Sequence, residues 1–165
     1  MAAEAGRLGE LQTVQNPSLG GYLIWQFGLG FQAEDSQQSS FLLAFLVLPL
    51  LLHKPTLDLI VSTRKSSGLA LFAAKLGEQH ENLLAVHSRA LALRQLSLQS
   101  IGIAANRGLV SVDYDGGHFR SNTPERKSPA LPERIRSMSP AAQKVVSWFS
   151  RLSVYQIASI LRVQF

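Results

Sequence analysis

The sequence contains no cysteine, and only 16% of its residues are charged. The lack of cysteine excludes disulfides and thiolate metal ligands, and nothing argues for an oxidising compartment, so the cytoplasm is the expected location. Charged residues usually make up about a quarter of a globular domain. A chain of ordinary size with so few charges is expected to cover part of its surface with a partner.

No apolar run is long enough to cross a membrane. The longest extends over residues 41–52, whereas a spanning helix needs roughly 20 residues. A signal peptide is not expected, because acidic Glu34 and Asp35 precede the run and no basic segment does. Peripheral membrane attachment would require a basic opposite face, which the run lacks. The run therefore predicts an apolar helix that protein must enclose, kinked near residues 45–46 by Pro49.

Patterns that carry catalysis or bind cofactors are also lacking. The four histidines form neither an HExxH motif nor a pair on adjacent helical turns. The glycines form no phosphate-binding loop, and no serine lies in a GxSxG motif. We therefore expect no catalytic residue, no metal site, no cofactor and no small-molecule substrate.

Caps and periodicity predict a mainly α chain with one β-hairpin. Asn16 and Pro17 indicate the start of a first helix, which the Gly28-Leu29-Gly30 segment is expected to end. Ser39-Ser40 follows a polar loop and is expected to cap the apolar helix. Further helices are predicted over residues 56–61, 69–76, 81–106, 140–152 and 153–161, with a hairpin over residues 109–120.

Several helices followed by one hairpin is the order of a winged helix. We therefore expect a winged-helix-like domain over residues 1–122, a basic proline-rich connector over residues 123–140, and a pair of C-terminal helices over residues 141–165. Within the helix predicted over residues 81–106, Leu84, Leu91 and Leu98 recur at seven-residue spacing. Arg94 lies among them, either as a buried ion-pair partner or, as we prefer, extending to the edge of the apolar face.

The net charge of +5 is unevenly distributed. Residues 1–53 carry one basic and four acidic residues, whereas residues 120–165 carry eight basic and two acidic ones. A basic segment can meet a phosphate backbone or an acidic protein surface, or can be only a solvated linker. The hairpin itself is nearly neutral, which disfavours sequence-specific reading of DNA. The candidate nucleic-acid contacts are Arg107, Arg120, Arg126, Lys127, Arg134 and Arg136.

Four segments together resemble a known family. They are Asn16-Pro17-Ser18-Leu19-Gly20, Leu23-Ile24-Trp25-Gln26-Phe27, Leu46-Val47-Leu48-Pro49 and Leu52-His53-Lys54-Pro55-Thr56. Over about residues 14–122 the chain resembles the middle component of bacterial three-component ABC systems, of which the Lamassu antiphage systems are the best known. The segment from Pro124 onward matches no motif of this family.

The resemblance implies a non-enzymatic subunit of an antiphage defence complex. It would bridge an ABC ATPase of the SMC or Rad50 type and a nuclease-type effector, and would contribute to DNA sensing or to restraint of the effector. The expected partner anchors lie on an apolar surface, because buried aromatics carry much interface energy: Trp25, Phe27, Phe45, Trp148 and Phe149. His53 and Lys54 are candidate partner contacts, or residues that terminate the apolar helix.

The alternative function is a winged-helix transcriptional regulator that acts as a dimer. It predicts salt-sensitive, sequence-selective binding of duplex DNA by the isolated chain. The subunit hypothesis predicts weak, non-selective DNA binding instead.

Overall fold

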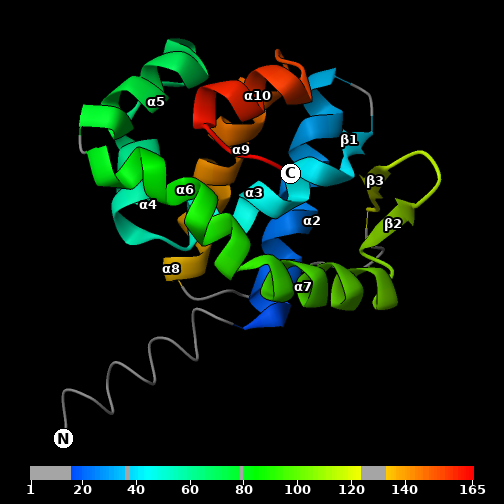
Figure 1. Ribbon diagram of the computed structural model, residues 1–165. Coiled ribbons are helices and arrows are strands. Elements are labelled where there is room, and N and C mark those ends of the chain that lie inside the picture. Colours follow the sequence, from blue (N-terminus) through cyan, green and yellow to red (C-terminus); the bar gives the residue numbers. More distant parts are fainter. Residues whose placement is uncertain (1–15, 36–37, 79, 124–132) are drawn as a thin grey trace, which may run out of the picture.

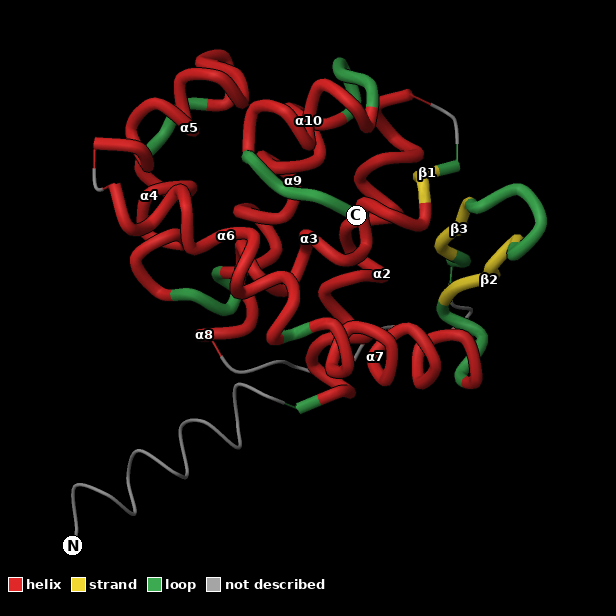
Figure 2. The backbone as a smooth tube through the Cα atoms, in the orientation of Figure 1, coloured by secondary structure: helices red, strands yellow, loops and turns green. Residues whose placement is uncertain are grey.

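The computed structural model describes residues 16–35, 38–78, 80–123 and 133–165. Within them the chain is mostly helical with one small antiparallel sheet, as the sequence predicts (Figures 1 and 2). The elements are, in chain order, α2 (Pro17–Asp35), β1 (Ser39–Ser40), α3 (Phe41–Leu51), α4 (Lys54–Ser62), the 3-10 turn η1 (Lys65–Ser67), α5 (Gly68–Glu78), α6 (His80–Ala92), α7 (Arg94–Asn106), β2 (Val110–Asp113), β3 (His118–Ser121), α8 (Glu133–Arg136), α9 (Met138–Phe149) and α10 (Val154–Leu161).

Helix α2 contacts α7 and α9 along its length. Its predicted start is confirmed, because the Asn16 side chain accepts a hydrogen bond from the N–H of Ser18 at 2.8 Å. The predicted end at Gly28-Leu29-Gly30 is wrong, since the helix continues to Asp35. These glycines serve close packing instead. A Cβ at Gly28 would lie 3.0 Å from the Phe119 ring, and one at Gly30 would lie 3.4 Å from Val146.

Helix α3 is enclosed by the rest of the chain, as predicted for the apolar run. Ser40 caps it by accepting a hydrogen bond from the N–H of Leu42 at 3.3 Å, and most of its residues from Leu43 onward are buried. Helix α4 begins at Lys54, two residues before the predicted start. The axes of α3 and α4 differ by 98°. Among the helices described, none alone combines the length and apolarity of a membrane span.

The helix predicted over residues 81–106 is in fact two helices. α6 and α7 meet at Leu93, whose backbone (φ −94°, ψ 4°) departs from helical geometry. The reason is tertiary: α6 packs on α3 and α5, whereas α7 packs on α2, and one straight helix cannot cover both surfaces. The leucines at seven-residue spacing lie outside the core, with Leu84, Leu91 and Leu98 exposed by 53%, 57% and 42%.

The predicted hairpin is confirmed as β2 and β3, in a register that pairs Asp113 with His118. A third strand, β1, pairs with β3 and gives the order β1-β3-β2. Two residues are too few to show a pattern of alternation, so this strand could not be predicted from the sequence. The sheet lies at one side of the molecule, opposite α4 and α5 (Figure 1).

The C-terminal helices join the same hydrophobic core as the preceding elements. Phe149 packs edge-on against Phe27, with ring centroids 6.0 Å apart, and Trp148 stacks on Phe72 at 5.1 Å. α9 begins at Met138, before the predicted cap at Ser139-Pro140. α8 forms part of the segment predicted to be a connector. Residues 124–132 of that connector lie outside the described ranges. The helix predicted over residues 153–161 is confirmed as α10, which Ser153 caps with a reciprocal bond from Gln156.

Candidate partner-binding groove

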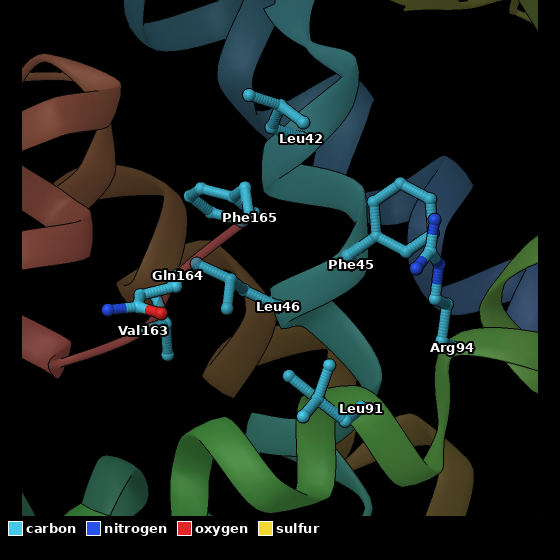
Figure 3. Close-up of a pocket in the computed structure, with 9 residues that line it drawn as sticks. Leu42, Phe45, Leu46, Leu91, Arg94, Val163, Gln164 and Phe165 are labelled. Carbon is cyan, nitrogen blue, oxygen red and sulfur yellow. The ribbon is translucent and has the colours of Figure 1, made fainter.

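An apolar groove opens where α3, α6 and the last residues of the chain meet (Figure 3). From α3 the groove is lined by Leu42 and, one helical turn later, by Phe45 and Leu46. Ala90 and Leu91 line it from α6, Arg94 from the start of α7, and residues 163–165 from the chain end. The hollow has a volume of about 110 Å³.

The groove exposes large apolar side chains. Leu42 is 40% exposed, Leu91 57% and Phe165 51%. Single exposed apolar residues are normal on a protein surface, whereas several that line one hollow make it a candidate binding surface. Figure 3 shows Phe165 and Leu46 on one side of α3, with Leu42 above and Leu91 below, whereas Phe45 lies on the other side of α3, next to Arg94.

The residues after α10 are fixed against the wall of this groove. α10 ends at Arg162 in the left-handed conformation (φ 55°), which turns the chain away from the helix. The Val163 side chain is buried, and its N–H donates to the carbonyl of Ala158 at 3.0 Å. The N–H of Gln164 donates to Nδ1 of His87 on α6 at 3.3 Å. These contacts place Phe165 in the lining of the groove that Leu42 and Leu91 also line.

Arg94 is the charged residue that borders the groove. It is exposed, which confirms the preferred prediction that it extends to the edge of the apolar face. No described residue forms a hydrogen bond or ion pair with its guanidinium. The described lining contains no Asp or Glu side chain. The groove is therefore apolar with a positive edge.

A polar network supports α3 behind the groove. Arg89 on α6 donates from Nε to the carbonyl of Pro49 at 3.3 Å and from a terminal nitrogen to Oγ1 of Thr56 at 3.1 Å. Oγ1 of Thr56 also lies 2.7 Å from Nδ1 of His53. Since Oγ1 accepts from Arg89, the hydroxyl proton is free to be donated to a neutral His53 ring. The network joins the end of α3 and the start of α4 to α6.

The electrostatics of the network favour this arrangement. Burial lowers the pKa of His53 from its ordinary value of 6.5, and the positive charge of Arg89 lowers it further. Burial also lowers the pKa of Arg89, though arginine stays protonated at neutral pH. His53 is therefore expected to be neutral beside a charged Arg89. The fully buried Thr56 contacts both side chains through its hydroxyl group.

Four of the five aromatic residues expected at a partner surface lie in the core instead. The four are at most 5% exposed, so other residues form the apolar surface: the buried ones are Trp25, Phe27, Trp148 and Phe149. Their packing partners come from segments distant in sequence, which the sequence alone could not place. Phe45 does line the groove.

His53 and Lys54 are adjacent in sequence but have different roles in the structure. His53 belongs to the network, whereas Lys54 is exposed and forms an ion pair with Asp58 at 3.0 Å. The Pro49 carbonyl near the end of α3 is satisfied by Arg89, a residue that the sequence did not single out for this role. The number of residues between the His-Lys-Pro-Thr segment and Arg89 does not predict this contact. The bend between α3 and α4 brings the segment and Arg89 together.

The candidate nucleic-acid contacts do not form one described patch. Arg107, at the end of α7, and Arg120, on β3, are exposed near the hairpin, whereas the exposed Arg136 lies on α8, away from it (Figure 1). Arg126, Lys127 and the side chain of Arg134 lie outside the described part of the structure. Among the residues that the structure does describe, no three His, Asp or Glu side chains gather as metal ligands would.

Comparison with known proteins gives one match. A family model described as "ABC-three component (ABC-3C) system Middle Component 3" matches residues 5–165. No curated protein and no solved structure matches the chain. The family match extends over the C-terminal segment from Pro124 onward, which the sequence motifs could not place.

Proposed function

Because the chain belongs to the Middle Component 3 family of ABC-three component systems, we propose that it is a non-catalytic subunit that joins an ABC ATPase to a third, effector component. A middle component works with the other components of its system. The surface that supports a joining role is the groove between α3, α6 and the chain end, where large apolar side chains are exposed.

The finer features of the proposal rest on the resemblance of the His-Lys-Pro-Thr and Asn-Pro segments to Lamassu-type systems. In this version the ATPase is of the SMC or Rad50 type, the effector is a nuclease, and the subunit restrains the effector until foreign DNA is sensed. Exposed Arg107 and Arg120 would supply non-selective contacts with phosphates.

The alternative, a winged-helix regulator, draws support from the hairpin and the strand β1 beside it. On the hairpin, however, Arg120 and His118 stand against Asp113 and Asp115, so the net charge there is small. A surface with so little positive charge is a weak phosphate contact. We therefore favour the subunit over the regulator.

Co-expression of all three components tests the proposal. With this chain present, a tag on the ATPase should recover the chain and the effector together. Without the chain, the same tag should recover the ATPase alone. Recovery of the effector in both cases would contradict the joining role, and sequence-selective duplex binding by the isolated chain would favour the regulator.

A further inference from the structure

Beyond the groove lining, α6 carries another exposed leucine on the side of Leu91. Leu84 and Leu91 are seven residues apart, which is about 10.5 Å along a helix, and both are more than half exposed. Residues seven apart in a helix point in nearly the same direction. Leu84 therefore extends the groove two turns toward the start of α6, with the polar His87 and Ser88 between the two leucines.

Leucines repeating at this spacing indicate the shape of the occupant. Seven-residue spacing of apolar residues is the pattern by which one helix packs its side chains between those of another. The described walls of the groove are α3, α6, the first residue of α7 and the chain end, and they offer no strand edge. An extended peptide would thus find no ladder of backbone hydrogen bonds, whereas a helix would find apolar contacts.

Charge indicates the chemistry of the occupant. Arg94 borders the apolar hollow without an ion-pair partner among the described residues, and no Asp or Glu side chain lies in the described lining. The whole chain carries a net charge of +5. A second copy of this chain would bring the same positive charge, whereas a segment with an acidic residue beside its apolar face would complement Arg94.

We infer that the groove, with its extension along α6 to Leu84, receives an amphipathic helix of another component that carries an acidic residue opposite Arg94. The occupant places apolar side chains against Leu42, Leu91 and Phe165, and its carboxylate pairs with the guanidinium of Arg94. This inference rests on the proposed function, because it requires the chain to act within an assembly.

Site-specific photo-crosslinking in the assembled complex tests the inference. Benzoylphenylalanine replaces Leu91 in the chain co-expressed with the ATPase and the effector, and the crosslinked peptide is identified by mass spectrometry. Leu71 on α5, 46% exposed and outside the groove lining, provides the matched control position. We expect the Leu91 probe to capture a helical segment of another component with Asp or Glu within one turn, and the Leu71 probe not to capture it.

Arg94 variants give a second readout. Because Arg94 is exposed and unpaired among the described residues, changing it should leave folding intact. Arg94→Gln should weaken binding of the purified partner component about threefold, and Arg94→Glu about tenfold, as expected for loss and reversal of one interfacial charge. Unchanged affinity in Arg94→Glu would overturn the acidic occupant.

The outcomes separate the two proposals. A Leu91 crosslink to a second copy of the chain, a crosslink to a basic segment, or no crosslink within an intact complex overturns the inference and leaves the subunit role standing. Failure of the unmodified chain to join any complex with the other components contradicts the subunit role itself.

Discussion

Thr56→Val should destabilise the protein although it changes the volume of the side chain very little. Thr56 is fully buried, and its hydroxyl oxygen contacts Arg89 at 3.1 Å and His53 at 2.7 Å. Valine replaces this hydroxyl with a methyl group and leaves no cavity. The substitution therefore isolates the polar contacts of the network.

The magnitude follows from the two bonds that are lost. A hydrogen bond to a charged group contributes about 1.5–3 kcal/mol and one between neutral groups about 0.5–1.5 kcal/mol. Two effects reduce this sum. Burial of an added methyl group returns about 0.8 kcal/mol, and half-buried Arg89 keeps its bond to the Pro49 carbonyl. We expect a net loss of about 2 kcal/mol in the free energy of unfolding.

Urea denaturation followed by circular dichroism measures this loss as a shift in midpoint at constant slope. Thr56→Ser is the matched control, since it keeps the hydroxyl and loses one buried methyl group, at about 1 kcal/mol. If valine is tolerated better than serine, the hydroxyl does not stabilise the fold and the network reasoning is refuted. Arg89→Met combined with Thr56→Val should lose about 1 kcal/mol less than the sum of the single losses.

Three further predictions concern other contacts that stabilise the fold. The pKa of His53 is depressed in the folded protein, so its stabilising effect should be complete above about pH 6.5 and decline as the pH falls toward the folded pKa; denaturation between about pH 5 and pH 8 should show this decline, and His53→Asn should reduce it. Gly20→Ala should destabilise by about 1–3 kcal/mol in thermal unfolding, because its Cβ would lie 2.9 Å from Cβ of Ser100, whereas Gly102→Ala, with nothing within 4 Å, should stabilise; equal effects would contradict this packing. Lys144→Met should cost about 1–3 kcal/mol, since Nζ donates to the carbonyls of Ile60, Val61 and Thr63 at the end of α4; an unchanged urea midpoint would exclude that cap.

Local signals predicted where helices begin. Asn16, Ser40 and Ser153 each accept a backbone hydrogen bond in the first turn, as their side chains and positions indicate. The β-hairpin was predictable for the same reason, because its turn residues and strand pattern are contiguous in sequence.

Tertiary contacts explain the features of the fold that could not be predicted from the sequence. Gly28 and Gly30 looked like a helix end, but they lie in α2 because β3 and α9 approach closely there. The bend at Leu93 arises because α6 packs on α5 and α7 packs on α2, although both also contact α3. Trp148 looked like an anchor for a partner, yet it stacks on Phe72, which lies far from it in sequence.

The groove was only partly predictable. Phe45 was a candidate partner contact, and Arg94 was expected at the edge of an apolar face. The contribution of residues 163–165 depends on the turn at Arg162 and on contacts with Ala158 and His87, and no local pattern encodes these.

The central claim is that the groove binds another component of the system. Its most direct test is size-exclusion chromatography, with mass measurement, of the three components co-expressed with Leu91→Asp or with the control Leu71→Asp. The two leucines are exposed by 57% and 46%, so both variants should fold, which circular dichroism checks. The account predicts that Leu91→Asp is lost from the complex and that Leu71→Asp stays in it. A folded Leu91→Asp chain that remains in the complex at full stoichiometry would contradict the account.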